Sequence, residues 1–121
     1  MKSLLEIEKL NITFEFNGQI VNAVKDSSFR INKGECLAIV GESGSGKSVT
    51  ALAIMRLIRS NSQLKISGSA TYKKKNLLNS DEFSLQNIRG KKISMIFQEP
   101  MTSLNPLHNI EKQITECFAL N

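Results

Sequence analysis

Apolar and polar residues alternate near the beginning of the chain, which is typical of strands with one buried face. Every second position over residues 10–16 is Leu, Ile or Phe, and the positions between them are polar. Asn17 and Gly18 follow at once and both tolerate positive φ, so they predict a tight hairpin turn. We expect the return strand over residues 19–24 and another short strand over residues 28–32. The chain is therefore expected to open with short antiparallel strands.

Later apolar segments have a different pattern, which predicts an α/β core. Residues 36–40 are five apolar residues without alternation, as in a central strand that is buried on both faces. Residues 49–59 contain no Gly or Pro and are apolar nearly all round, which predicts a largely buried helix. Residues 92–97 are again strand-like, and the helical crossover between the two strands favours a parallel arrangement. The expected fold class is thus α/β, with an antiparallel β subdomain at the N-terminus.

Three weaker patterns complete the expected elements. Residues 65–72 predict an edge strand, and residues 80–87 predict a short helix. After Asn105 and Pro106, apolar residues recur at every fourth position and predict a terminal amphipathic helix. These apolar residues are Ile110, Ile114 and Phe118. No apolar run approaches the roughly 18 residues of a membrane span or a signal segment, so we expect neither.

The segment between the first core strand and the buried helix carries the clearest chemical motif. Residues 41–48 read GESGSGKS and match the pattern G-x-x-x-x-G-K-[ST], which requires a strand before it and a helix after it. Glycines in such a loop let the backbone N–H groups turn inward around a phosphate. Lys47 is expected to reach the β- and γ-phosphates of a nucleoside triphosphate, and Ser48 to offer its hydroxyl to Mg²⁺. The candidate phosphate-binding residues are Gly41, Ser43, Gly44, Ser45, Gly46, Lys47 and Ser48.

Charge and cysteine content add little to this prediction. The 121 residues include 16 Lys and Arg against 11 Asp and Glu, a formal charge of +5 that suits an anionic partner. The lysine run in residues 72–76 is interpreted as a solvated turn, because no aromatic ladder for stacking nucleic-acid bases accompanies it. Cys36 and Cys117 have no ligand-spaced partner, so we expect neither zinc nor a disulfide framework.

Gln98 is a second candidate for the nucleotide site. It follows the strand expected over residues 92–97, and α/β folds place ligands at the carboxyl ends of their strands. A neutral amide there suits a contact with the γ-phosphate or with a Mg²⁺-bound water. On spacing alone, a surface glutamine in a loop is equally acceptable.

Together, these residues resemble the N-terminal part of an ATP-binding subunit of an ABC transporter. Residues 29–35, FRINKGE, are similar to the strand and turn that precede the phosphate loop in that family. Residues 89–106, RGKKISMIFQEPMTSLNP, are similar to the subfamily that imports oligopeptides, dipeptides or nickel. The resemblance covers residues 1–121, which implies an incomplete P-loop NTPase core. It runs from the Walker A loop to the Q-loop and the start of the helical subdomain.

The resemblance implies roles for individual residues. Residues 41–48 correspond to the Walker A loop, with Lys47 acting in catalysis and Ser48 on the metal. Gln98 corresponds to the Q-loop glutamine, which links the γ-phosphate and Mg²⁺ to the membrane partner and counts as both catalytic and metal-binding. The aromatic residue that stacks on adenine is expected just before the hairpin turn, with Phe16 as the first choice and Phe14 as the second.

The resemblance also implies cofactors and partners. The cofactors are ATP and Mg²⁺. The partners are transmembrane permease subunits and a second ATP-binding subunit, with no nucleic acid. The expected location is peripheral, at the cytoplasmic face of the cell membrane, with the chain soluble if unassembled.

The sequence departs from the family in what it lacks. The signature sequence, the Walker B aspartate, the catalytic glutamate that follows it and the switch histidine do not occur in these 121 residues. We therefore expect the chain as it stands to be a poor ATPase, with the sheet edge at residues 92–97 unpaired. Two alternatives stay open: a small P-loop kinase with a lid formed by Arg89, Lys91 and Lys92, and a nucleotide-binding module that does not hydrolyse ATP.

Overall fold

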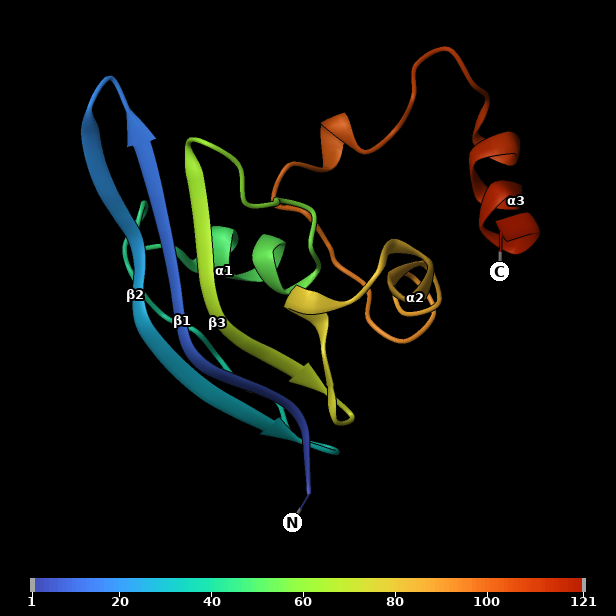
Figure 1. Cartoon of the computed structure of the whole chain (residues 1–121). Coiled ribbons are helices and arrows are strands. Elements are labelled where there is room, and N and C mark those ends of the chain that lie inside the picture. The colour runs from blue at the N-terminus through green and yellow to red at the C-terminus, as the bar shows by residue number, and fades with distance from the viewer. Residues whose placement is uncertain (1, 121) are drawn as a thin grey trace. The chain divides into compact units, whose positions relative to one another are not determined.

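The chain divides into two compact units, Met1–Asp81 and Glu82–Asn121, which are described separately. The computed structural model describes residues 2–120. An antiparallel sheet and one helix dominate the first unit, whereas short helices and extended segments make up the second (Figure 1). This organisation matches the expected combination of an N-terminal β subdomain with a phosphate loop and helix.

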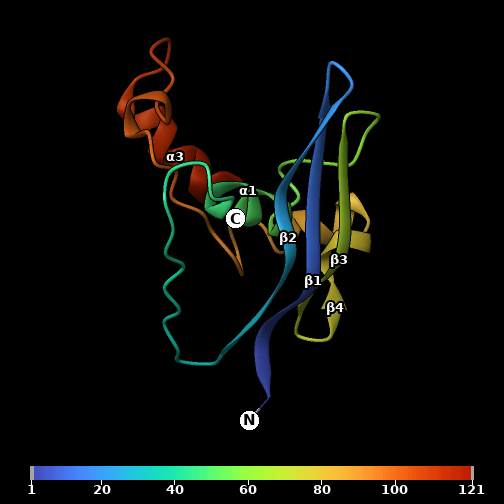
Figure 2. The same ribbon diagram turned by 90° about the vertical axis from the view of Figure 1, so that its left-hand side faces the viewer.

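The sheet of the first unit is antiparallel throughout. Its strands are β1 (Ser3–Phe16), β2 (Gln19–Asn32), β3 (Leu64–Tyr72) and the short β4 (Lys75–Asn76), in the order β2-β1-β3-β4 (Figure 2). The expected hairpin is confirmed, because Phe16 pairs with Gln19 across the turn. The two return strands expected after the turn form one continuous strand, β2.

β1, β2 and β3 each continue through a residue with positive φ, and these three backbone irregularities lie beside one another in the sheet. Lys9 in β1 and Asp26 in β2 have φ values of 48° and 49°, and Gly68 in β3 has a φ of 96°. The side chain of Asn11 joins two of these points: its Nδ2 donates to the Lys9 carbonyl at 2.8 Å, and its Oδ1 accepts from the Asp26 N–H at 2.9 Å. A Cβ at Gly68 would overlap the carbonyl oxygen of Lys9, so only glycine fits beside the bulge.

The bulge at Lys9 has a direct effect on the core. Side chains alternate between the two faces of a strand, so one extra residue shifts the buried positions by one. Ile7, Leu10 and Ile12 are consequently all buried on one face, although their spacing is irregular. The rest of the core comes from β2, from the helix at residues 47–54, from β3 and from the segments after β3. Its buried apolar residues include Val24, Ala53, Ile54, Leu64, Ala70 and Leu77.

The helix after the phosphate loop is shorter than expected. Helix α1 spans Lys47–Ile54, whereas the sequence predicted residues 49–59. It ends because Arg56 adopts a φ of 51°, which an α-helix does not contain. The Arg56 guanidinium donates to the carbonyl of Ser80, which follows the 3₁₀ helix Leu77–Asn79. This bond gives the segment after α1 a fixed attachment within the first unit.

The two predicted core strands do not form, and both predictions are wrong. Residues 36–40 and 92–97 are not part of any ladder among the described residues, apart from an isolated parallel bridge between Arg89 and Ile93. Val40 is 91% exposed and Ile96 is 98% exposed. Central parallel strands need hydrogen-bonded neighbours and covering layers on both faces, and no described residue supplies them here.

The second unit contains the two helices that the sequence predicted there. Helix α2 (Glu82–Gln86) and helix α3 (Ile110–Leu120) are joined by a segment that includes the 3₁₀ helix η2 (Pro100–Thr102). Gln113 of α3 receives the N–H of Asn105 at 2.8 Å and donates to its carbonyl at 3.0 Å, which secures the segment before the helix. Among the described residues, no helix has the length and apolarity needed to cross a membrane.

The turn after β2 offers a test of the fold by pH. The N–H and the side-chain amide of Asn32 donate to the two carboxylate oxygens of Glu35 at 2.8 and 2.9 Å. These bonds lower the pKa of Glu35, with a smaller contribution from the charge of Arg30. The stabilisation is therefore present above 4.5, the ordinary pKa of glutamate, and is lost as the pH falls through the lower pKa of Glu35 in the folded chain.

We expect Asn32→Ala to raise the pKa of Glu35 toward its ordinary value, because the side-chain donor is lost. Titration of the Glu35 carboxyl by NMR measures this directly. Removing Arg30 as a control, by Arg30→Ala, is expected to move the pKa less, because its charge contributes least. A pKa of Glu35 that is the same in Asn32→Ala as in the native chain would contradict the assignment.

Candidate functional site: a phosphate-binding loop

The glycine-rich loop connects the extended residues 36–40 to the first turn of α1, all within the first unit. Gly46 is the N-cap of α1, with a φ of 91°. The N–H and the hydroxyl of Thr50 both donate to the Gly46 carbonyl, at 3.0 and 2.7 Å. The loop is thus joined to a helix start whose free N–H groups favour an anion.

Gly46 also lies directly against the sheet. A Cβ at this position would overlap the carbonyl oxygen of Ala23 in β2 and would lie 3.0 Å from a methyl group of Val24. Gly44 has a φ of 80°, and a Cβ at Gly41 would lie 2.5 Å from the Ser45 hydroxyl. Close packing and positive φ therefore require the glycines of the motif, which leaves backbone rather than side chains around the space where a phosphate belongs.

The ammonium group of Lys47 is held by the loop itself. Its Nζ donates to the carbonyls of Gly41 and Glu42 at 2.5 and 2.7 Å and to the Ser45 hydroxyl at 3.0 Å. Ser48 is exposed, and its hydroxyl has no hydrogen bond within residues 2–120. Ser43 is exposed in the turn at the tip of the loop. The structure therefore brings together a positive charge, a free hydroxyl and the helix N-terminus, as the motif predicted.

A hollow of about 400 Å³ adjoins the loop on the side of the sheet. It lies between β2, the extended residues 36–40 and the start of α1. Its lining is mixed: apolar side chains come from β2 and from residues 36–40, and polar side chains come from β2, the loop and the start of α1. The lining includes Val24, Phe29, Leu37, Ile39, Lys47 and Thr50. The contacts of Thr50 and Val24 with the loop were not anticipated from the sequence, although a threonine three residues after the motif lysine is suited to bond back to the preceding turn.

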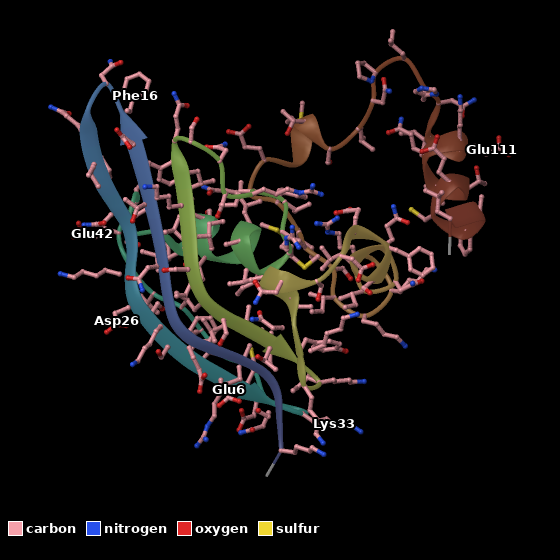
Figure 3. The ribbon with its side chains drawn as sticks, viewed as in Figure 1. Glu6, Phe16, Asp26, Lys33, Glu42 and Glu111 are labelled. Carbon is pink, nitrogen blue, oxygen red and sulfur yellow. The ribbon has the colours of Figure 1, made fainter. Side chains whose placement is uncertain are left out.

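Phe16 lies at the tip of the β1–β2 hairpin and is 69% exposed (Figure 3). Residues 12, 14 and 16 share one face of β1 because side chains alternate. Ile12 pairs with Val24, whose methyl group packs beside Gly46, so this face of the sheet carries the phosphate loop. Phe14 lies on the same face, opposite Leu64 of β3, and is only half-buried.

Gln98 belongs to the second unit, after the extended residues 92–97 and before η2. It is exposed and is not at the end of a strand, since the expected strand is absent. The phosphate loop and Phe16 thus both belong to the first unit and lie on the same face of its sheet. The role of Gln98 stays a prediction from the sequence.

Fold and site together define a nucleotide-binding core of the P-loop class. A model of the family described as "ABC transporter" matches residues 24–119, and the chain belongs to this family. It is 51% identical to the oligopeptide transport ATP-binding protein OppD of Bacillus subtilis over 113 residues, which is 93% of this chain and 32% of the relative. It is 48% identical over 120 residues to YejF of Escherichia coli, described as an uncharacterized ABC transporter ATP-binding protein, covering 99% of this chain and 23% of that protein.

A solved structure supports the same assignment. The dimeric structure of MJ0796, a bacterial ABC transporter cassette, aligns with a TM-score of 0.79 at 25% identity, covering 95% of this chain and 47% of that one. The match confirms the expected fold class, a P-loop NTPase core with an antiparallel β subdomain. These 121 residues span about a quarter to a third of the two curated relatives, 23% and 32%.

Proposed function

We propose that residues 1–121 form the N-terminal part of the nucleotide-binding domain of an ABC importer for peptides or nickel, and that they bind Mg²⁺-ATP. The observation that carries the proposal is the loop at residues 41–48, which is closed around the Lys47 ammonium and seated on β2 by Gly46. Relatives named for oligopeptide and glutathione import favour a peptide cargo.

The residues of the loop fit a triphosphate and its metal ion. Backbone N–H groups at the start of α1 would hold the phosphates, and the Lys47 ammonium would exchange its carbonyl partners for phosphate oxygens. Ser48 is suited to the metal because its hydroxyl is exposed and without another partner. When bound, Mg²⁺ neutralises charge on the phosphates. Gln98 is proposed to contact the γ-phosphate and the metal through its amide.

Phe16 is proposed to stack on the adenine ring, because it is exposed and lies on the sheet face that carries the phosphate loop. We expect Phe16→Ala to weaken Mg²⁺-ATP binding by about tenfold, since stacking on an aromatic ring contributes about 1–3 kcal/mol. Phe16→Trp should retain the affinity. Calorimetric titration of the 121-residue chain with Mg²⁺-ATP measures both.

Two variants make this test specific. Phe118→Ala removes an exposed phenylalanine from the second unit and should leave the affinity unchanged. Phe14→Ala tests the second candidate for stacking on adenine. If Phe14→Ala weakens binding and Phe16→Ala does not, the stacking role belongs to Phe14.

The proposed partners are transmembrane permease subunits and a second ATP-binding subunit, at the cytoplasmic face of the membrane. The names of the relatives as transport ATP-binding proteins support the first, and the dimeric form of the solved cassette supports the second. A small P-loop kinase has less support, because the Arg89 guanidinium is paired with Glu82 at 2.6 Å rather than available to a lid. Transfer of labelled phosphate to an acceptor would favour the kinase.

A further inference from the structure

Four lysines gather at the end of the sheet that is opposite the hairpin tip. Lys2 precedes β1, Lys33 follows β2, and Lys73 and Lys74 form the turn between β3 and β4. All four are exposed and line a hollow of about 570 Å³. Figure 3 shows Lys33 at this end of the sheet, away from Phe16. This lysine-lined hollow is separate from the phosphate loop.

The register of the sheet brings the lysines together from distant parts of the chain. Ser3 pairs with Asn32, which places the start of β1 beside the turn that contains Lys33. Leu5 pairs with Tyr72, and the N–H of Lys73 donates to the Leu4 carbonyl at 3.2 Å. The arrangement is thus a property of the folded sheet and not of the lysine run alone.

Charge in this hollow is poorly compensated. Glu6 is the one acidic residue among those that line it, and it accepts a hydrogen bond from the Ser3 hydroxyl at 3.3 Å. None of the four lysines lies within ion-pair distance of a carboxylate in the described part of the chain. Concentrated positive charge without a paired carboxylate favours an anionic ligand.

The turn between β3 and β4 has an unusual sequence for its geometry. Tyr72 pairs with Lys75, so the loop has two residues, and both have positive φ: 46° at Lys73 and 72° at Lys74. Asn-Gly is the preferred pair in such a turn, because lysine is strained at positive φ. Two lysines at these positions cost stability, which indicates that their charge serves another purpose.

We propose that the lysine-lined hollow binds the phosphate headgroups of anionic phospholipids and so holds the first unit at a membrane surface. The proposal rests on the proposed function, because a transporter ATP-binding subunit works beside a bilayer. The lysine ammonium is a compact point charge on a flexible stem, which suits mobile phosphate headgroups, and no arginine with its rigid fork lines this hollow.

Two further observations favour a membrane over nucleic acid. The Lys73 ammonium lies over one face of the Tyr72 ring, 5.5 Å from the ring centre, and no aromatic residue lines the hollow to form a ladder for stacking bases. Leu4 and the lysine stems supply apolar surface beside the charges, as in interfacial membrane contacts.

The test uses sedimentation of the 121-residue chain with vesicles of phosphatidylglycerol and phosphatidylcholine, compared with pure phosphatidylcholine vesicles. The variant Lys73→Asn/Lys74→Gly removes two charges and gives the turn its preferred sequence, so loss of folding is not expected. We expect binding to the anionic vesicles to fall about 25-fold, since each lysine near such a surface contributes about fivefold.

Lys91→Ala/Lys92→Ala is the matched control, because it removes an adjacent pair of exposed lysines from the second unit. Its binding should stay within about twofold of the native chain, since those lysines lie outside the hollow. Equal loss in both variants, or no loss in the turn variant, overturns the proposal. Tighter binding of a polyglutamate peptide than of the vesicles would assign the hollow to an acidic protein, and competition by inorganic phosphate beyond its effect as a salt would assign it to a free anion.

Titration of the same variants with Mg²⁺-ATP separates this proposal from the one on which it rests. The turn variant should bind Mg²⁺-ATP as the native chain does. If the native chain binds vesicles but not Mg²⁺-ATP, the proposed function fails. If the native chain binds Mg²⁺-ATP and the turn variant still binds vesicles normally, only the membrane contact fails.

Discussion

Lys47→Ala is expected to weaken the binding of Mg²⁺-ATP to this chain by about 100-fold. A lysine that contacts two phosphates contributes charge-assisted hydrogen bonds of about 1.5–3 kcal/mol, and each 1.4 kcal/mol is a factor of ten in affinity. In the structure this ammonium bonds to Gly41, Glu42 and Ser45, so it is already placed at the loop. Calorimetric titration measures the affinity, and phosphate release is followed in the same samples.

Lys25→Ala is the control for loss of one positive charge, because Lys25 borders the neighbouring hollow but has no bond to the loop. We expect it to change the affinity by less than about threefold. No phosphate release is expected from either variant or from the native chain, since the residues that activate water are absent from these 121 residues. Steady release that requires Lys47 would contradict this and would indicate a self-sufficient P-loop enzyme.

Gly46→Ala is expected to destabilise the first unit by about 2 kcal/mol or more and to abolish nucleotide binding. A non-glycine residue with a φ of 91° costs about 1–2 kcal/mol, and overlap with a backbone oxygen adds to that because the backbone cannot rotate away. The new methyl group would meet the carbonyl of Ala23 and the side chain of Val24. Urea unfolding gives the free-energy difference.

Gly34→Ala separates the two causes. Gly34 has a φ of 82°, but a Cβ there would have no heavy atom within 4 Å. The Gly34→Ala variant should therefore lose only the stability that corresponds to the strained φ, about 1 kcal/mol, and should keep its affinity for Mg²⁺-ATP. If both glycine variants lose the same free energy, the close approach of Gly46 to β2 has no energetic role.

The features that the sequence predicted correctly depend on local chemistry. The hairpin at Asn17 and Gly18, the phosphate loop and the terminal helix follow from turn residues, a motif and apolar spacing within a few residues. The apolar run at residues 36–40 is different. Its composition indicates that the segment is suited to burial, but it does not indicate that neighbouring strands are present to pair with it. Its prediction as a central strand required partners that residues 2–120 do not provide.

Long-range register also escaped prediction. Nothing in the sequence near Lys9 indicates that its bulge lies beside Asp26 and Gly68, because those contacts join three strands. The lysine-lined hollow is of the same kind, since the lysine run was interpreted as a solvated turn and Lys2 and Lys33 are distant from it in sequence. The phosphate loop was predictable because one short segment forms it. The contacts between this loop and β2 were not predictable, because they join segments that are distant in the sequence.

The bulge at Lys9 also determines how this hairpin tolerates change. The Asn11 side chain fixes β1 and β2 to each other at the bulge. The number of residues between the bulge and Phe16 is therefore set within β1 and does not depend on the length of the turn. The turn at residues 17 and 18 can therefore change in length while Phe16 keeps its position along β1. Insertions between residues 17 and 18 should leave the Phe16 ring on its face of the sheet, whereas a single insertion between residues 11 and 16 should move the ring to the opposite face.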